Sequence, residues 1–253
     1  MSKAWGSLVS LVFLSAQILA ADDRPAINVT YYDYPPTMKI VDGRPAGPYV
    51  DQIVRVAETA GLTIHWLLTT INTETKMLDQ GVRQICTTGR LHNEDRASRW
   101  LYVPYEWDWL PGDIIIAQPD KATAVAEHAH ILDLLHDRSL HPMMVGGSTF
   151  GNVIDKAIKY RDHWIANDVG SEIQVIKLLA AGRADYTVIA FDQWEEALAA
   201  DQSLSFLSAL KIDGVLPPAP IYLTCSKATD PMVITKLGEA MGKLGYKYRP
   251  DIH

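Results

Sequence analysis

Short apolar strands alternate with amphipathic helices along this chain, and this alternation limits its possible folds more than any other feature. In the first half, strands are predicted at residues 27–31, 63–68, 84–88, 100–103 and 114–117, and helices at residues 50–60 and 75–80. Alternation of this kind produces crossover connections between neighbouring parallel strands. The sequence therefore predicts an α/β fold in which helices flank a mostly parallel sheet.

The same pattern restarts in the second half of the chain. Helices are predicted at residues 131–136, 152–160, 173–181 and 192–199, and strands at residues 143–145, 186–190 and 204–209. A proline-rich connector at residues 216–220 then leads to a strand at 221–225 and a helix at 231–244. Two such units predict two lobes around a cleft, and ligands prefer such interfaces and the carboxyl ends of strands.

The first residues have the composition of a signal peptide. Lys3 precedes a mostly apolar run at residues 4–19, and the small residues Ala20 and Ala21 precede a polar segment. The run is shorter than the about 20 apolar residues that span a bilayer. We expect residues 1–21 to be removed by cleavage near Ala20 or Ala21, and the mature protein to be periplasmic. An uncleaved anchor is the alternative.

Charge and cysteine content narrow the class of protein further. The formal net charge is −7, which argues against a nucleic-acid partner because nucleic-acid-binding proteins carry basic surface stripes. Cys86 and Cys225 each end a predicted strand, and export would permit a disulfide between them. Two separate buried thiols are an equally acceptable interpretation, because free cysteine packs well as a small apolar residue.

A polar segment after the third predicted strand has the residues of an anion site. Arg96 and Glu94 lie in a predicted loop, beside a glycine turn at Gly89. A guanidinium next to open backbone amides can bind a carboxylate through two parallel hydrogen bonds. The chain shows no nucleophile–base pair and no phosphate loop, so these residues indicate a receptor for a small polar molecule without a cofactor, and not an enzyme.

Two other groups of residues give weaker signals. The segment around Ser148 lacks the Gly-x-Ser-x-Gly spacing of a nucleophile elbow, because Phe150 stands where the last glycine should be. Four histidines, at positions 128, 130, 136 and 141, suggest a metal site. No set of cysteine or acidic ligands converges on them, so we interpret them as surface residues and predict no metal.

Several short motifs follow one another in a defined order. They are Tyr34-Pro35-Pro36, Asp42-Gly43, Gly47 with Asp51, Glu94-Asp95-Arg96, Gly147-Ser148-Thr149, Gly182-Arg183-Ala184-Asp185 and Cys225-Ser226-Lys227. With these motifs the chain, from about residue 27 to residue 244, resembles the bacterial family 3 extracellular solute-binding proteins. The best-known members of that family bind polar amino acids for ABC importers. The resemblance implies a two-lobed, hinged receptor with a type II periplasmic binding fold.

The resemblance also implies lobe boundaries. It places the first lobe at residues 22–117, the second at 118–215, and a return segment at 216–253 that completes the first lobe. We expect hinge motion at the two crossovers, near Gln118-Pro119 and at residues 216–220.

Ligand-binding roles follow only where the motifs match. Arg96 occupies the position whose arginine binds a ligand carboxylate in the family. Other matching positions are Thr87, Thr88 and Gly89 at the strand end, Tyr34 and Tyr31 as aromatic covers, and Ser148 and Thr149 as donors at the start of a helix. Trp107 or Trp109, which flank a charge in a predicted loop, is a further candidate to face the cleft.

One position departs from the family pattern. Amino-acid-binding members place an acidic residue near the end of the strand after Gly182-Arg183-Ala184-Asp185, where it holds the α-ammonium group. This chain has Ala190 there, and the nearest carboxylate is Asp192. Asp192 could take over the role, because two residues further along a strand lie on the same face, or it could cap the next helix. A ligand that has a carboxylate and no amine is therefore an alternative to an amino acid.

The expected function is that of a monomeric receptor that closes on a small carboxylate, such as an amino acid, and delivers it to an ABC permease. A periplasmic enzyme resembling cyclohexadienyl dehydratase is the main alternative. It would need a general acid, for which Glu106 and Asp108 are the candidates. A sensory or accessory binding module with another membrane partner is the second alternative.

Overall fold

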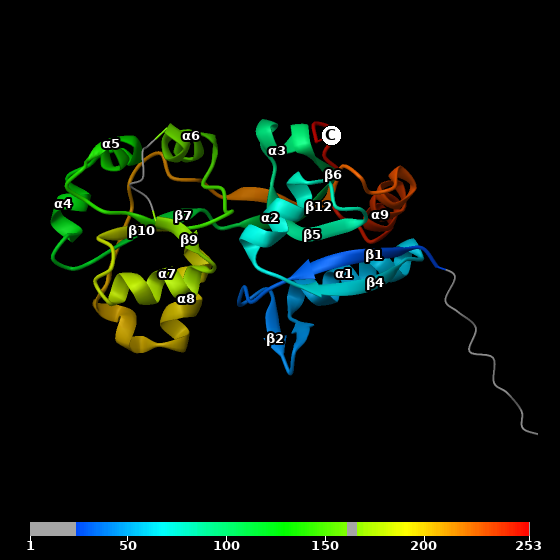
Figure 1. The fold of residues 1–253 in the computed structure, drawn as a ribbon, viewed down its shortest axis with the longest axis horizontal. Helices are drawn as coiled ribbons and strands as arrows, with labels where there is room; N and C mark the ends of the chain where they lie inside the picture. Colours follow the sequence, from blue (N-terminus) through cyan, green and yellow to red (C-terminus); the bar gives the residue numbers. More distant parts are fainter. Residues whose placement is uncertain (1–23, 161–165, 253) are drawn as a thin grey trace, which may run out of the picture.

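The protein has two lobes that lie side by side, as the ribbon in Figure 1 shows. The computed structural model describes residues 24–160 and 166–252. The predicted signal peptide at residues 1–21 lies outside this part. Within it, none of the helices combines the length and the apolar character that crossing a membrane requires.

A five-stranded sheet with the order β4-β1-β5-β12-β6 forms the centre of the first lobe. β1 (Ala26–Tyr31) pairs in parallel with β4 (Thr63–Leu68) and with β5 (Ile85–Leu91). β12 (Ala219–Ser226) comes from the end of the chain and runs antiparallel to both β5 and β6 (Trp100–Leu110). The last strand of the chain thus lies inside the sheet that the first strands build.

Helices cover this sheet through apolar stripes. α1 begins with Pro48, which suits a first helical turn, and it buries Ile53, Val56 and Ala57 in the same core as Leu237 and Met241 of α9. The helices of this lobe are α1 (Pro48–Ala60), α2 (Ile71–Asp79), α3 (Glu94–Arg99) and α9 (Pro231–Lys243). A hairpin of β2 (Lys39–Val41) and β3 (Arg44–Ala46) lies beside α1.

The second lobe is arranged around β7 (Asp113–Ala117). This strand lies between β10 (Tyr186–Ala190) and β11 (Ser208–Leu210), and it is antiparallel to both. β8 (Met143–Val145) and β9 (Ala166–Val169) pair in parallel. The helices of this lobe are α4 (Ala122–Ala126), α5 (Ile131–His136), α6 (Asn152–Tyr160), α7 (Glu172–Ala180) and α8 (Phe191–Ala200), followed by the 3-10 turn η1 (Gln202–Phe206).

The predicted boundary after residue 117 is wrong, because β7 belongs to the second sheet. The chain leaves the first lobe between Leu110 and Asp113, before β7 and not at Gln118. A central apolar strand looks the same in sequence whichever sheet receives it. The return crossover ends at Ala219, and the two crossovers lie against each other, with the Asp113 amide donating to the Leu216 carbonyl at 2.8 Å.

Three further predictions need correction. Residues 204–209, predicted as one strand, contain the end of η1 and only part of β11. The loop expected around Trp107 and Trp109 is the second half of β6, which runs on to Leu110. The loop expected to hold Arg96 is the short helix α3. Alternating charged and aromatic residues hid the strand, and a helix of this length has too few turns for its period to show.

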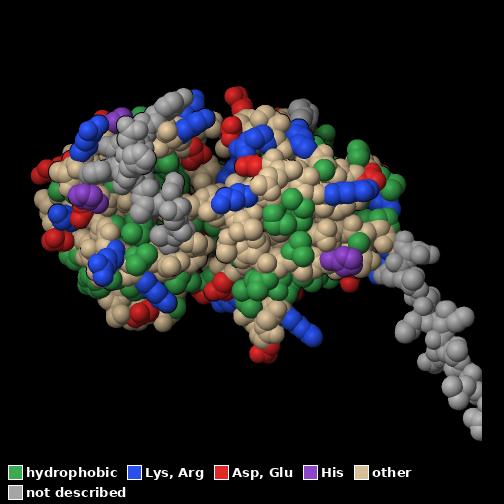
Figure 2. Space-filling view, viewed as in Figure 1, with side chains coloured by type: hydrophobic (Ala, Val, Ile, Leu, Met, Phe, Trp, Pro, Cys, Tyr) green, Lys and Arg blue, Asp and Glu red, His purple; other side chains and the backbone are tan. Residues whose placement is uncertain are grey.

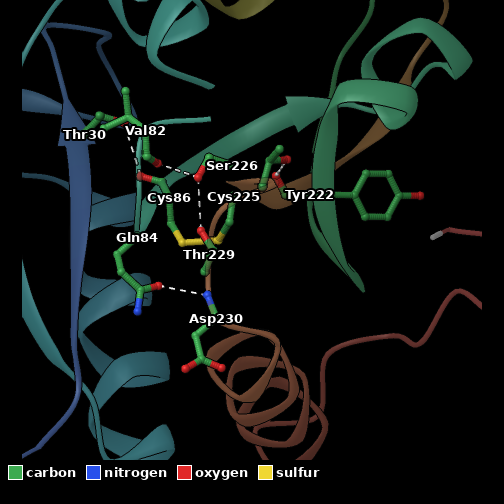
Figure 3. Close-up of a disulfide and its surroundings, with 10 residues drawn as sticks. Thr30, Val82, Gln84, Cys86, Tyr222, Cys225, Ser226, Thr229 and Asp230 are labelled. Atoms are coloured by element: carbon green, nitrogen blue, oxygen red, sulfur yellow. Dashed lines mark hydrogen bonds between the residues drawn. A yellow bond between two sulfur atoms is a disulfide. The ribbon is translucent and has the colours of Figure 1, made fainter. Parts of the chain in front are cut away.

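A disulfide joins Cys86 of β5 to Cys225 of β12, whose Cα atoms lie directly opposite in the ladder. Figure 3 shows the bridge with the contacts that surround it, including the Ser226 hydroxyl, which donates to the Val82 carbonyl at 2.5 Å. The two cysteines are 139 residues apart. The bridge therefore fixes the return segment to the first lobe.

Breaking this bridge should destabilise the protein without changing its fold. We expect reduction, or the double substitution Cys86→Ala/Cys225→Ala, to lower the free energy of unfolding by about 2–5 kcal/mol, because the unfolded chain regains the freedom of a long loop. Denaturant titrations with and without reductant measure this. Reductant should have no effect on the double variant, and an unchanged midpoint in protein whose thiols are proved free would contradict the expectation.

Candidate ligand site

A cavity lies between the two lobes and is lined from both. Its polar lining consists of Tyr32, Tyr34, Tyr49, Thr88, Arg90 and Arg96 from the first lobe, and Ser148, Thr149 and Glu172 from the second. A smaller space adjoins it and extends to Asp113 and Ala190. Strand ends and the loops that follow them supply most of these residues, as the α/β pattern predicts.

Arg96 is buried in this cavity, with 6% of its surface exposed. Its guanidinium lies 4.8 Å from the centre of the Trp100 ring and donates to the Gly147 carbonyl of the other lobe at 3.3 Å. Among the described residues, no carboxylate lies within 4.0 Å of it. Burial, helped by the charge of Arg90, lowers the pKa of Arg96 to about 10, so the group is still a cation at neutral pH. The described part of the chain provides no ion-pair partner for it.

The neighbouring Arg90 differs, because its charge is already compensated. Its Nε donates to Glu74 at 2.8 Å, and its terminal nitrogen pairs with the same carboxylate. The Thr30 hydroxyl donates to the second carboxylate oxygen. Sequence reasoning missed this buried pair, because Glu74 and Arg90 come from different elements and no local pattern connects them. Of the two guanidinium groups that line the cavity in the described residues, that of Arg90 is paired with a carboxylate and that of Arg96 is not.

Of the predicted strand-end residues in β5, some line the cavity and one does not, because side chains alternate between the two faces of the strand. Thr88 and Gly89 line the cavity, and the Thr88 hydroxyl is buried with no hydrogen-bond partner among the described residues. Thr87 is 1% exposed, pairs with Thr224 in the sheet and does not line the cavity. Successive side chains of a strand point to opposite faces, so these three consecutive residues do not share one role.

The aromatic predictions divide in the same way. Tyr34 lines the cavity as expected, and Tyr32 and Tyr49, which sequence reasoning had not selected as ligand contacts, line it too. Tyr31 is buried in the core of the first lobe. Trp107 does not line the cavity; it stacks on Tyr246 with ring centres 5.9 Å apart, in the same core. The proposed Trp107 contact with a ligand is therefore wrong for this conformation.

Trp109, the other indole considered, is 51% exposed and donates to Glu106 at 3.0 Å. It does not line the cavity either.

Ser148 and Thr149 line the cavity from the second lobe. They do not start a helix, because α6 begins at Asn152, so they lie in the turn before it. Asp155 organises this turn: its carboxylate accepts from the Thr149 hydroxyl and, at 2.8 Å, from the Phe150 amide. Thr149 is therefore already engaged, and Ser148 is the hydroxyl of this pair with no such partner among the described residues.

The position that departs from the family pattern faces the adjoining space. Ala190 lines it, whereas Asp192 lines neither part of the cavity. Asp192 does not cap α8 as a side chain, because the N-cap is Ala190; it lies in the first turn and accepts from the Gln193 amide at 2.8 Å. Glu172, which sequence reasoning missed, lines both parts of the cavity.

The lobes are closed around this cavity. The Gly147 carbonyl accepts from the Thr75 hydroxyl of α2 at 3.2 Å, besides its bond from Arg96. At the other side, the side-chain amide of Gln193 donates to the Pro35 carbonyl at 2.7 Å. Figure 2 shows the lobes in contact, with positive and negative side chains mixed over both and no basic stripe on the face in view.

Comparison with known proteins identifies the architecture. No family model and no curated protein sequence matches this chain. Among solved structures, a histidine kinase sensor domain with similarity to periplasmic binding proteins matches with a TM-score of 0.68 and 19% identity, over 89% of this chain and 98% of that one. This chain has the periplasmic-binding-protein fold.

Two further solved structures share this periplasmic-binding-protein fold. The arginine-, lysine-, histidine-binding protein ArtJ from Geobacillus stearothermophilus matches with a TM-score of 0.69 and 14% identity, over 87% of this chain and 89% of that one. An ancestral amino acid-binding protein, a precursor of cyclohexadienyl dehydratase, matches with a TM-score of 0.64 and 15% identity, over 87% and 88%. The two-lobed α/β fold expected from the sequence is thus confirmed. The expectation of a mostly parallel sheet fails in the second lobe, where β7 is antiparallel to both of its neighbours.

Lobe closure should depend on the absence of a side chain at Gly147. A Cβ atom there would lie 2.9 Å from the Cα atom of Asn72 in the other lobe, and backbone cannot easily move aside. We expect Gly147→Ala to weaken ligand binding by about 1–3 kcal/mol, as overpacking does. Calorimetric titration measures the affinity.

Gly182→Ala is the matched control. Gly182 has φ +71 against +81 for Gly147, so both substitutions strain the backbone similarly, but a Cβ at Gly182 meets no atom within 4 Å. Equal affinity losses in the two variants would show that strain, and not the contact between the lobes, is responsible.

Proposed function

We propose that this protein is an exported solute-binding receptor that closes its lobes on a small carboxylate, an amino acid or a related acid, and delivers it to an ABC importer. The observation that carries the proposal is the Arg96 guanidinium, buried between the lobes without a carboxylate partner among the described residues. A buried charge is costly unless it is paired. A ligand carboxylate would supply the missing partner.

The surrounding groups suit this role. A carboxylate on Arg96 can also accept from the unpartnered Thr88 hydroxyl and from Ser148 of the second lobe. Such a ligand would connect both lobes and stabilise the closed state, because ligand binding to one conformation shifts the equilibrium toward it. The adjacent crossovers, at residues 110–113 and 216–219, provide the hinge. The receptor would act as a periplasmic monomer and use no cofactor.

The enzyme alternative receives less support from the two acids considered for it. Glu106 lies in β6 and forms ion pairs with Lys247 at 3.0 Å and Arg249 at 2.9 Å. Burial opposes ionisation, but hydrogen bonds from Arg249 and the other partners hold the pKa of Glu106 below its ordinary value. A general acid must be protonated at the working pH. Neither Glu106 nor Asp108 lines the cavity.

The sensory alternative rests on the similarity to a kinase sensor domain. Its fold and a transport receptor's fold are the same, so the partner decides between them. Co-purification of the closed protein with a permease would support transport, and co-purification with a membrane-bound kinase would support sensing. Turnover of prephenate or arogenate by the purified protein would instead support the enzyme.

The substitution Arg96→Ala tests the proposed function. Affinity for the ligand should fall by about 2–4 kcal/mol, as it does when one partner of a desolvated charge pair is removed. Arg96→Lys should recover only part of this loss, because an ammonium group keeps the charge but cannot form the two parallel hydrogen bonds of a guanidinium. Because Arg96 is buried and also contacts Gly147, thermal unfolding without ligand must be measured beside the calorimetric titration.

Arg99→Ala is the matched control. Arg99 lies in the same helix, also contacts the Trp100 ring, and pairs with Asp79 and Asp95 outside the cavity. Its removal should leave affinity within about twofold, since exposed ion pairs contribute little. The proposal fails if a thermal-shift screen of amino acids and organic acids at millimolar concentration finds no stabilising compound, or if Arg96→Ala binds as the parent does.

A further inference from the structure

Among the described residues that line the main cavity, Glu172 is a carboxylate with no ion-pair partner. Arg90 is neutralised by Glu74, which lies behind it and does not line the cavity. The main cavity then presents the cation of Arg96 and a single carboxylate among the described residues, that of Glu172. The adjoining space adds Asp113. Glu172 is thus the carboxylate that both parts of the cavity share.

The position of Glu172 is fixed by the helix that carries it. It is the first residue of α7, after the N-cap Ser171, whose hydroxyl accepts from the Gln174 amide at 3.3 Å. Val175 and Ile176 bury the next turn in the core of the second lobe. The carboxylate accepts from its own backbone amide, and no ion pair or side-chain hydrogen bond joins it to another described residue. It is held in place, and residues 24–160 and 166–252 supply no cationic partner for it.

We propose that Glu172 binds a cationic group of the ligand, so that the ligand carries both a carboxylate for Arg96 and an amine for Glu172. The inference rests on the proposed receptor function and deepens it by naming the ligand class, a zwitterion such as an α-amino acid. It assigns the amine to the first residue of α7, in the second lobe. The strand end at Ala190, where an acidic residue is missing, then needs no substitute.

The electrostatics of the site favour this assignment. Burial raises the pKa of Glu172 to about 7, with its own backbone amide and Arg90 acting in the opposite direction and Asp192 adding to the rise. The other titratable groups whose charges interact with it are Tyr34, Tyr32 and Asp113. Burial raises the pKa of both phenols, so they stay neutral. A ligand ammonium would supply the cation that none of these groups provides.

A prediction about pH follows from this assignment. An amine binds the ionised Glu172, so affinity for an amino acid should fall by about tenfold between pH 8 and pH 6, as a group with a pKa of about 7 becomes protonated. A ligand with a carboxylate and no amine should show the opposite trend, since it avoids the ionised form. The pKa of Asp113 is also raised to about 7, by burial and by Asp192. Substitutions at each position therefore have to distinguish the titration of Asp113 from that of Glu172.

The experiment compares matched ligands and variants by calorimetric titration. The ligand pair is the amino acid that best stabilises the parent and the 2-hydroxy acid with the same side chain. Glu172→Gln should weaken binding of the amino acid by roughly 10- to 100-fold, as loss of a hydrogen bond to a charged group does, and should not weaken binding of the hydroxy acid. It should also abolish the pH dependence, whereas Asp113→Asn should preserve it.

Two control variants separate the explanations. Glu195→Gln removes an exposed carboxylate of α8 that does not line the cavity, and it should change nothing. Asp192→Asn should leave the preference for the amine intact. The inference is overturned if the hydroxy acid binds the parent as tightly as the amino acid, or if Asp192→Asn and not Glu172→Gln removes the preference. If neither class of compound binds at all, the receptor function itself fails.

Discussion

The return of β12 into the first sheet is the constraint on which the rest of the architecture depends. This strand lies between β5 and β6, and the Cys86–Cys225 bridge fixes it there. Because the chain must leave the first lobe before β7 and come back before β12, two crossovers connect the lobes. They lie side by side through the hydrogen bond from Asp113 to Leu216. A pair of adjacent connections allows a hinge motion and opposes free rotation of the lobes.

The cavity between the lobes contains both paired and unpaired charges. Arg90 is paired with Glu74, which belongs to the same lobe. Arg96 and Glu172 come from different lobes and are not paired with each other or with another described residue. Burying unpaired charges lowers the stability of the closed state. A receptor can use this property, because a ligand that pairs with both charges stabilises the closed state.

Much of the secondary structure follows from local pattern. Apolar periodicity located α5, α6, β4, β8 and β10 with the bounds that the structure shows, because each has an apolar stripe or run between turn residues. Apolar periodicity missed three elements. In the second half of β6, charged residues alternate with aromatic ones, α3 is short, and the β2–β3 hairpin is exposed. The assignment of β7 to a lobe failed for a different reason, since sheet membership depends on partners elsewhere in the chain.

For the site, the sequence by itself determined the residues that stand in recognisable order along the chain. Arg96, Thr88, Gly89, Tyr34, Ser148 and Thr149 were found in this way, and the structure brings them to one cavity. Only the tertiary structure decided that Thr87 and Trp107 point into the core, and that Arg90 is neutralised while Arg96 is not. The role proposed for Glu172 depends on Arg96, which lines the same cavity from the opposite lobe. The physical reason is that a charge is functional or structural according to what lies within a few ångströms of it, and sequence order does not contain that distance.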